Sequence, residues 1–351
     1  MNLQSYLAKS SKETNEALLR FFPKKFSSKW FARYFGKPSF RIDESALQKS
    51  VADPIWDFLD RGGKRWRPGL LLLACEAVGG NRKKAVSFTV LPELVHNGTI
   101  MIDDVQDSST LRRGKPSTHL LFGVDVAVNA GNAMYFLPLL KLFSGPSLDA
   151  KTKSKIYDLY VREMVFLSFG QATDIHWHHG YSNKVSESEY LQMCSFKTGS
   201  LSRFAAQLGA ILGGASEKQV GAFADFATSI GVAFQIQDDI LNLVPSEGWG
   251  KETGDDISEG KRTLIVIRAF SVLQKKKKRR LIKLLDSKTT SVSEIQEAIS
   301  ILSECGAMDY ASSVAKKLVL KSWSKLDGVL KDSDSKKLLK EFAGYLIERE
   351  V

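Results

Sequence analysis

The sequence predicts an all-α protein, and three observations lead to that fold class. Apolar residues recur every three or four positions through most of the chain, as in residues 45–60, 154–169 and 293–320. Strand-like alternation joined by hairpin dipeptides is absent from the sequence. Several segments are apolar on nearly every side, which is typical of helices in the centre of a protein. We therefore expect many helices and no substantial sheet.

Local signals place some helix ends. Ser45 and Ser293 are candidate N-caps, and the glycine pairs Gly79–Gly80 and Gly213–Gly214 are candidate stops. No repeat of fixed period and no linker rich in Pro, Ser or Gly divides the chain. The sequence predicts one domain over residues 43–351, preceded by an extension over residues 1–42.

Composition excludes several protein classes. The 351 residues are 43% hydrophobic and 25% charged, as in ordinary globular proteins. The longest uncharged run, Val126 to Leu140, is shorter than the roughly 18 residues of a membrane span. The three cysteines are scattered, which argues against a disulfide scaffold or a thiolate zinc site. The first residues lack the pattern of a secretory signal, so we expect a cytoplasmic protein.

The charge balance points to an anionic partner. Lys and Arg number 50 against 39 Asp and Glu, a formal net charge of +11. Nucleic acid, a membrane surface and small anionic substrates all fit such an excess. The basic run 275–280 has no nucleic-acid-binding motif beside it and is typical of a solvated helix, so we expect no nucleic-acid partner.

Residues 20–41 combine cations and aromatic rings and contain no acidic residue. Phe22, Phe26, Trp30 and Tyr34 are four residues apart, so on a helix they form an aromatic stripe. The stripe fits a peripheral contact with anionic lipid, and it fits packing onto the domain equally well.

An acidic cluster follows an apolar helical segment in the first half of the chain. Asp103 and Asp107 share one helix face, one turn apart, and Asp104 is beside them. Stacked carboxylates repel one another unless a cation lies between them. Hard oxygen ligands with room for substrate phosphates suit Mg²⁺. The residues just before Asp103 are apolar, which argues against the alternative that this cluster is only a solvent-exposed helix face.

A second acidic cluster repeats this arrangement. Asp238, Asp239 and Asn242 follow the apolar run from Ile230 to Ile236. Two such helices facing each other across a cavity would place Mg²⁺ ions against a diphosphate. Basic residues follow both clusters, as a site for a metal-bound diphosphate requires.

Six motifs, in order, resemble those of the trans-isoprenyl diphosphate synthases. They are GGKRWRP (62–68), the first aspartate motif with its trailing LRRG, GQATD (170–174), KTGSL (197–201), FQIQDD (234–239) and a GK…EGKRT stretch (250–263). The resemblance implies a bundle of mostly antiparallel helices around a central cavity, usually a homodimer. It also implies a Mg²⁺-dependent, head-to-tail condensation of isopentenyl diphosphate with an allylic diphosphate. Asn242, where the motif commonly has Asp, would be a weaker metal ligand.

The resemblance also implies a role for each matching residue. Asp103, Asp107 and Asp238 correspond to ligands of what are usually three Mg²⁺ ions, with Asp104 and Asp239 supporting them. The residues that bind the allylic diphosphate are Arg112, Lys197, Lys251 and Lys261. Those of the isopentenyl diphosphate site are Lys64, Arg67, His96 and Arg113. Those that lie beside the reacting carbons are Gln171, Thr198, Phe234 and Gln235.

Product length in this family depends on the residues that close the cavity below the first aspartate motif. Gly98 and Thr99 are small, so the floor is expected deeper, at Met134, Tyr135 and Phe136, with Ala133 as a possible opening. Bulk at that depth resembles synthases of the twenty-carbon geranylgeranyl diphosphate. Farnesyl or longer-chain synthases, a class I terpene cyclase and a non-catalytic partner subunit are the alternatives.

Overall fold

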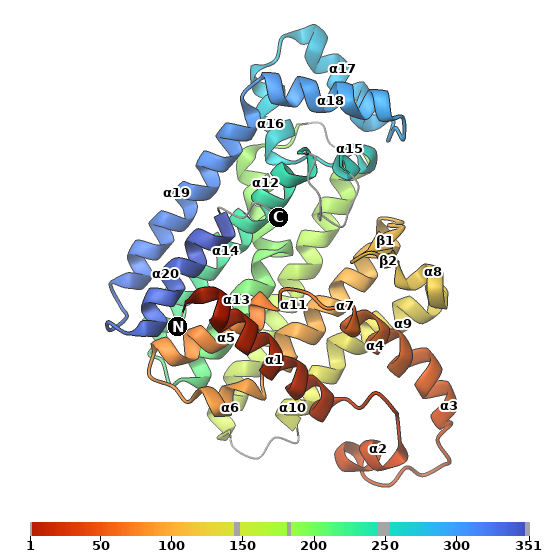
Figure 1. Ribbon diagram of the computed structural model, residues 1–351, viewed down its shortest axis with the longest axis vertical. Coiled ribbons are helices and arrows are strands. Elements are labelled where there is room, and N and C mark those ends of the chain that lie inside the picture. The colour runs from red at the N-terminus through yellow and green to blue at the C-terminus, as the bar shows by residue number, and fades with distance from the viewer. Residues whose placement is uncertain (1, 144–147, 181–183, 245–252, 348–351) are drawn as a thin grey trace. The chain divides into compact units, whose positions relative to one another are not determined.

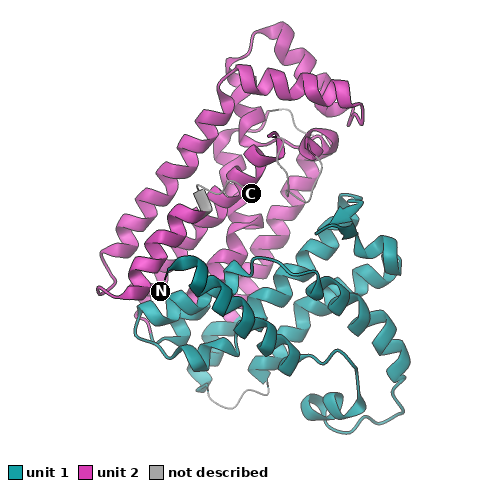
Figure 2. Cartoon of the chain, in the orientation of Figure 1, with its two compact units in different colours: residues 1–157, 208–214 teal, residues 158–207, 215–351 magenta. Residues whose placement is uncertain are grey.

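Two helices are shared between two compact units of the chain. The computed structural model describes residues 2–143, 148–180, 184–244 and 253–347. Unit 1 comprises residues 1–157 and 208–214, and unit 2 comprises residues 158–207 and 215–351 (Figure 2). Two of the three boundaries fall inside continuous helices, α11 (Ala150–His178) and α13 (Gly199–Leu212), and the third follows the end of α13. No linker rich in Pro, Ser or Gly marks the boundaries that lie within helices.

Unit 1 is built around α7, which packs along α9 and also contacts α5 (Figure 1). The leucine-rich α5 is buried on all sides, as its apolar sequence predicts. Besides its parts of α11 and α13, the unit contains α1 (Leu3–Phe21), α2 (Ser28–Phe35), α3 (Glu44–Leu47), a π-helical turn (Gln48–Ala52), α4 (Asp53–Asp60), α5 (Trp66–Ala77), α6 (Arg82–Val86), α7 (Val90–Gln106), β1 (Leu111–Arg112), β2 (Lys115–Pro116), α8 (Thr118–Phe122), α9 (Val124–Phe136), a 3₁₀ turn (Leu137–Leu139) and α10 (Leu140–Phe143).

Unit 2 is organised by α14, which lies side by side with α19 (Figure 1). A capping box at Ser216 and Gln219 begins α14. Besides its parts of α11 and α13, unit 2 contains α12 (Glu187–Lys197), α14 (Glu217–Asn242), α15 (Asp255–Glu259), α16 (Leu264–Val272), α17 (Lys275–Asp286), α18 (Val292–Glu304), α19 (Ala307–Asp327) and α20 (Asp334–Ile347). The basic run in α17 pairs with glutamates from α18: Arg280 contacts Glu294 and Glu297, and Lys277 contacts Glu304.

The N-terminal segment is part of unit 1. Helix α1 packs on α5 and buries Tyr6, Leu18 and Phe21. The aromatic stripe of the following segment packs inward: Phe22 is 2% exposed and Tyr34 is 8% exposed. This outcome matches the packing alternative for the stripe, because its rings contact one another edge to face instead of facing solvent.

A two-residue hairpin, which the sequence analysis did not predict, follows α7. Strands β1 and β2 pair antiparallel through Leu111 and Pro116. The two turn residues, Arg113 and Gly114, both have positive φ, 53° and 71°. This conformation matches the turn that closes tight hairpins. The sequence signal was the Arg-Gly dipeptide, which is weak because arginine rarely adopts that backbone conformation.

The glycine stops are confirmed and the N-caps are displaced. Helix α5 ends at Ala77 before Gly79, and α13 ends at Leu212 before Gly214. Asp43 caps α3 in place of Ser45, and α18 starts after Ser291 in place of Ser293. Each cap is therefore two residues earlier than predicted.

One stretch, Val124–Phe143, is long and apolar enough to cross a membrane by length and composition. The sequence analysis excluded a span because it counted only uncharged runs, whereas this stretch includes Asp125 and Lys141. Helices in protein cores pass the same test. Here the stretch is divided into α9, a 3₁₀ turn and α10, and α9 packs on α7.

Candidate active site

The first aspartate motif lies at the C-terminal end of α7. Asp103 and Asp107 are half-buried, whereas Asp104 is fully buried. Nε and Nη2 of Arg112 donate to Oδ1 of Asp104 over 2.8 and 2.5 Å. The hairpin after α7 therefore brings Arg112 back onto the motif. Burial lowers the pKa of Arg112, but Asp104, Asp103 and Asp107 outweigh that effect and raise it, so the guanidinium stays charged.

Arg67 and His96 meet in unit 1, as the resemblance implies. Nη1 of Arg67 is 3.1 Å from Nε2 of His96, and its guanidinium lies 4.2 Å from the centre of the Trp66 ring. Burial, followed by the charges of Arg67 and Arg113, holds the pKa of His96 well below its usual range. His96 is therefore neutral and accepts the hydrogen bond from Arg67. Lys64 is exposed.

Arg113 is held on the glycine pair of the GGKRWRP motif. Its Nη1 donates to the carbonyl of Gly62, and its Nη2 donates to Oδ1 of Asn97 over 3.1 Å. A Cβ on Gly63 would lie 3.2 Å from Cζ of Arg113, so the glycine lets the guanidinium lie flat against the backbone. Burial, which outweighs the nearby Glu93, lowers the pKa of Arg113 to about 10. It remains a cation at neutral pH.

The sequence analysis missed two buried polar residues on α7 behind this pocket. Glu93 is 2% exposed and binds Arg65, and Asn97 binds Glu93 and Arg113. Their signal was a glutamate in the first turn of an apolar helix, three residues before His96. Such a group requires a buried partner, and that partner is distant in the sequence.

The second aspartate motif lies near the end of α14. Asp238 is half-buried and Asp239 is 4% exposed. The Tyr190 hydroxyl donates to Oδ2 of Asp239 over 2.6 Å, and Nε2 of Gln235 donates to Oδ1 over 2.9 Å. Burial, with the charge of Asp256, raises the pKa of Asp239 to about 8. The hydroxyl of Thr198 donates to Oε1 of Gln235 over 2.8 Å, which connects KTGSL to this motif.

Lys197, at the end of α12, pairs with a residue of the GQATD motif. Its Nζ lies 2.6 Å from Oδ2 of Asp174, which is 8% exposed. A Cβ on Gly170 would collide with the backbone nitrogen of Lys197. Glycine at this position therefore allows α12 to end directly against α11. The spacing of the motifs did not reveal Asp174 as the partner of Lys197.

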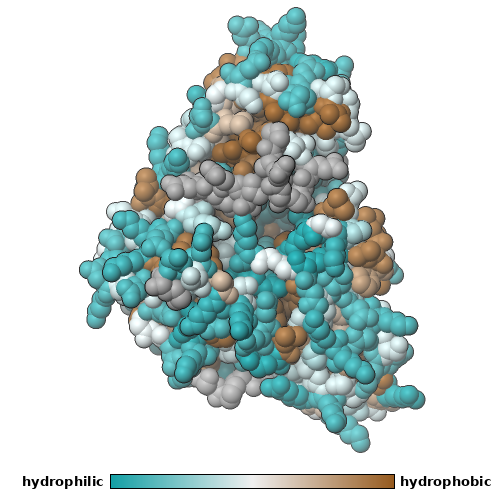
Figure 3. Space-filling view, in the orientation of Figure 1, coloured by the Kyte–Doolittle hydropathy of each residue, from teal (hydrophilic) through white to brown (hydrophobic). Residues whose placement is uncertain are grey.

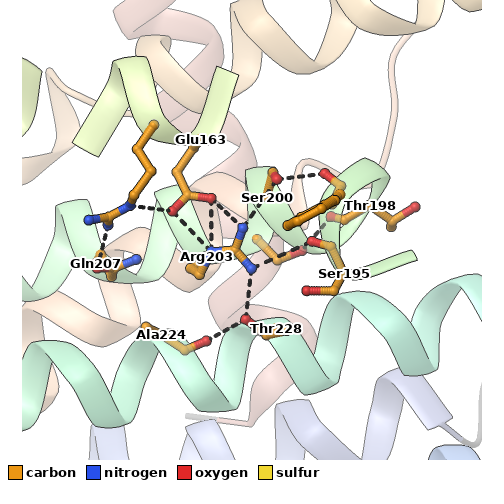
Figure 4. Close-up of polar contacts among 11 residues, drawn as sticks. Glu163, Ser195, Thr198, Ser200, Arg203, Gln207, Ala224 and Thr228 are labelled. Carbon is orange, nitrogen blue, oxygen red and sulfur yellow. Dashed lines mark hydrogen bonds and ion pairs between the residues drawn. The ribbon is translucent and has the colours of Figure 1, made fainter. Parts of the chain in front are cut away.

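A polar cluster fastens the start of α13 to α11 and α14 (Figure 4). Nε of Arg203 donates to both carboxylate oxygens of Glu163, over 3.0 and 2.8 Å. Its Nη1 donates to the Thr228 hydroxyl over 3.0 Å, and its Nη2 donates to Ser200 over 3.2 Å. Ser200, where the motif commonly has Gly, also donates to the carbonyl of Phe196. The cluster fixes the backbone on both sides of Lys197 and Thr198.

The other residues of unit 2 to which the resemblance assigns a role differ in their contacts and burial. Lys261 pairs with Asp256 at 3.4 Å and with Glu259, and together with Asp239 it lines a small cavity. Oδ1 of Asn242 accepts from the backbone N–H of Asp256, so this oxygen holds α15 and is not free to bind a metal. Gln171, Phe234 and Asp238 are half-buried. Lys251 lies outside the described residues.

The residues expected to set product length differ in their packing. A Cβ on Gly98 would lie 2.8 Å from Cβ of Met134 and 2.9 Å from the Gly131 carbonyl, so Gly98 serves the close packing of α7 on α9 and opens no space. Phe136, in contrast, is 69% exposed within unit 1. Thr99 donates to the His96 carbonyl, and Ala133 is half-buried.

Met134 and Tyr135 lie on the side of α9 that faces α7. Met134 is fully buried, and the Tyr135 ring passes 3.3 Å from the Cβ position of Gly98. Burial, and secondly the charge of Asp103, raise the pKa of Tyr135. The side chain therefore lies along α7 on the same side as the first aspartate motif.

Carboxylates of unit 1 fit the donor chemistry of Mg²⁺. Among the residues described, no three His, Cys, Asp or Glu side chains converge into a metal site. Mg²⁺ usually takes only one or two carboxylates and completes its shell with water and substrate phosphate. Asp103 and Asp107, half-buried and one turn apart, offer that number of oxygens, while Asp104 is engaged by Arg112.

Comparisons with known proteins agree with this set of residues. A family model described as Polyprenyl synthetase matches residues 48–302. A geranylgeranyl diphosphate synthase of Methanosarcina mazei is 37% identical over 83% of this chain and 87% of its own. A geranylfarnesyl diphosphate synthase of Natronomonas pharaonis is 32% identical over 83% and 87%. The crystal structure of geranylgeranyl pyrophosphate synthetase from Pyrococcus horikoshii superposes with a TM-score of 0.85 at 30% identity, covering 99% of this chain and 98% of that one. The chain belongs to the polyprenyl synthetase family of prenyltransferases.

Proposed function

We propose that this prenyltransferase is a geranylgeranyl diphosphate synthase that condenses isopentenyl diphosphate with an allylic diphosphate. The observation that carries the proposal is the pairing of two anion sites on α7. His96 and Asp103 are seven residues apart, so they share a helix face about 10 Å apart. The cations Arg67 and Arg113 gather around His96, and carboxylates with Arg112 gather around Asp103. A terpene cyclase has no use for the first of these sites.

Each set of residues has a task in the reaction. The Arg67 and Arg113 guanidiniums hold the diphosphate of isopentenyl diphosphate, which keeps its C–O bond. Arg112 and Lys197 grip the allylic diphosphate, which departs with the electron pair of its C–O bond. The double bond of isopentenyl diphosphate then attacks the allylic cation and forms the new C–C bond, and the proton that the resulting cation loses passes to the departed diphosphate. Gln235 and Thr198, already hydrogen-bonded to each other, present oxygens to the allylic carbons.

Mg²⁺ is the cofactor that these carboxylates suit, and three ions per site is the number that the resemblance implies. Asp103, Asp107 and Asp238 would hold the ions, which when bound draw negative charge from the leaving diphosphate. Asp104 and Asp239 have protein partners and act behind them.

The assay that tests the proposal separates the candidate activities. Purified protein is incubated with isopentenyl diphosphate and, separately, dimethylallyl, geranyl or farnesyl diphosphate, with Mg²⁺ or EDTA, and the dephosphorylated products are sized. We expect a Mg²⁺-dependent twenty-carbon alcohol. A fifteen-carbon or a longer product refutes the product assignment. A hydrocarbon indicates a cyclase, and absence of any product indicates a non-catalytic subunit.

Product length rests on Tyr135 and Met134. Tyr135→Ala removes a ring beside Gly98 and should shift the product toward 25 carbons, whereas Tyr135→Phe keeps the volume and the twenty-carbon product. Phe136→Ala is the comparison variant and should leave the product length unchanged, because that side chain is exposed in unit 1. Lengthening by Phe136→Ala, with none by Tyr135→Ala, would refute this floor.

A homodimer is supported by apolar surface on both units. In unit 2, α11 exposes Val161, Val165 and Phe169, which are four residues apart and form one stripe. In unit 1, apolar atoms are exposed over α8 and the start of α9, at Leu120, Leu121 and Val124 (Figure 3). Val165→Glu should reduce the mass measured by light scattering to that of one chain. Val292→Glu, on an apolar residue outside the stripe that is 82% exposed, should not. A monomeric wild type refutes the dimer.

Peripheral membrane contact through residues 20–41 is supported by side chains beside the packed stripe that are exposed. Phe35 and Phe40 are 52% and 87% exposed, and Arg33 and Lys37 beside them are exposed as well. A cytoplasmic enzyme held at an anionic membrane surface in this way would deliver its greasy product directly. Sedimentation with anionic vesicles should carry wild type down, and Phe35→Ser with Phe40→Ser should release it. Equal sedimentation with neutral vesicles refutes the contact.

A further inference from the structure

The N-terminal helix reaches the pocket proposed for isopentenyl diphosphate through one side chain. Oδ1 of Asn15 on α1 accepts a hydrogen bond from Nε of Arg65 over 2.7 Å. Arg65 lies in the GGKRWRP motif, is 6% exposed and has a positive φ of 47°. Its Nη2 donates to the Leu59 carbonyl over 2.9 Å, and its Nη1 binds Glu93. Each of the three nitrogen atoms of this guanidinium therefore donates to a protein acceptor.

Hydrogen bonds continue from Arg65 to the substrate-facing cation. Oε1 of Glu93 also accepts from Nδ2 of Asn97 over 2.6 Å, and Oδ1 of Asn97 accepts from Nη2 of Arg113 over 3.1 Å. The chain of contacts thus runs from Asn15 through Arg65, Glu93 and Asn97 to Arg113. Every member belongs to unit 1.

The charges along this chain explain why it is needed. Besides burial, the pKa of His96 is lowered by four positive charges, those of Arg65, Arg67, Arg112 and Arg113. The pKa of Arg113 is likewise lowered by burial and by its cationic neighbours. Glu93 is the buried carboxylate that opposes this repulsion. Hydrogen bonds from Arg65 and Asn97 fix the Glu93 carboxylate. Because Asn97 also accepts from Arg113, the position of Glu93 determines where the Arg113 guanidinium lies.

We propose that α1 is a positioning element of the isopentenyl diphosphate site, and that Asn15 acts on substrate binding through Arg65, Glu93 and Asn97. The inference rests on the function proposed above. It assigns a role in catalysis to a segment that the sequence analysis set apart as an extension.

A second contact between α1 and the rest of unit 1 provides the matched control. Glu13, two residues before Asn15, accepts from Nε and Nη2 of Arg82 over 3.1 and 2.7 Å. Arg82 also binds Glu76 and lies 4.6 Å from the Tyr6 ring. This group ties α1 to α5 and α6 without touching the arginines around His96. Glu13→Gln therefore weakens the attachment of α1 while leaving the pocket intact.

The experiment measures kcat, both KM values and melting temperature for Asn15→Ala, Asn15→Asp and Glu13→Gln. Losing one hydrogen bond to a charged group should raise the KM for isopentenyl diphosphate about threefold to tenfold in Asn15→Ala. The KM for the allylic substrate should stay unchanged. Asn15→Asp keeps an acceptor for Arg65 and should retain the wild-type KM. Asn15 is exposed, so these variants should fold.

Three outcomes overturn the inference. They are unchanged KM values in Asn15→Ala, an equal rise of both KM values, and a rise in Glu13→Gln as large as in Asn15→Ala. A wild-type enzyme that does not consume isopentenyl diphosphate at all refutes the proposed function instead, so the two failures are distinguishable.

Discussion

The buried carboxylate of the first aspartate motif, Asp104, is paired with a guanidinium, whereas that of the second motif, Asp239, is held by the neutral donors Tyr190 and Gln235. The letters of the two motifs are nearly the same, and their electrostatics differ. Asp104 forms a buried ion pair with the charged Arg112, while burial raises the pKa of Asp239 to about 8. The comparison teaches that the neighbours brought by the fold decide the charge of a carboxylate in a motif.

The largest effect should come from the carboxylates that the two motifs have in common. Asp103→Asn and Asp238→Asn each remove a proposed metal ligand, and we expect kcat to fall on the order of a thousandfold in both. Single-turnover measurements with saturating Mg²⁺ test this, with melting temperature as the control for folding. Near-normal kcat in either variant would remove that motif from metal binding.

The next largest effect should come from breaking the buried ion pair of the first motif. Asp104→Asn leaves Arg112 without its counter-charge, and such losses cost about 3–5 kcal/mol of unfolding free energy. The double variant Asp104→Asn with Arg112→Gln should regain part of that loss. Urea denaturation of the two single variants and the double variant measures the coupling. Simple additivity would contradict the pairing.

A much smaller effect is expected from the matching change in the second motif. Asp239 is largely protonated at pH 7 if its pKa is about 8, so Asp239→Asn replaces one neutral group with another of the same shape. We expect kcat at pH 7 to fall less than about tenfold, since only hydrogen-bond geometry changes. A loss as large as that of Asp238→Asn would show that Asp239 works as an anion.

The smallest effect is a difference in pH dependence. Because the pKa of Asp239 is higher in the folded than in the unfolded chain, the folded state retains a proton that the unfolded state releases. This contribution to stability is full below about pH 4 and is lost as pH rises toward 8, by at most about 1.4 kcal/mol per unit. Asp239→Asn should have a flatter profile of urea midpoints between pH 5 and 8. Parallel profiles would contradict the raised pKa.

Local patterns were sufficient to predict the fold class and the two aspartate motifs. Helical periodicity and the glycine stops depend on near neighbours in sequence, and the motif residues on α7 keep the one-turn spacing that the letters imply. The resemblance implied that Arg67, His96 and Arg113 share a site, and the structure brings them together in unit 1.

The partners of these residues could not be predicted, because they depend on chain crossings. Asn15 reaches Arg65 across 50 positions, and Lys197 reaches Asp174 across 23. The close packing of Gly98 against α9 could not be predicted for a related reason. A small residue on a helix indicates either space or close contact, and only the position of α9 decides between them.

The left-handed backbone at Arg65 and Arg113 has a consequence for engineering. Both positions favour glycine, and each costs on the order of 1 kcal/mol when an arginine occupies it. Glycine at either position would relieve that strain, but it would also leave buried Glu93 without Arg65 or Asn97 without Arg113, which costs more. A programme of stabilisation should therefore leave both positions unchanged, because the contacts of the two guanidiniums outweigh the strain of the backbone that presents them.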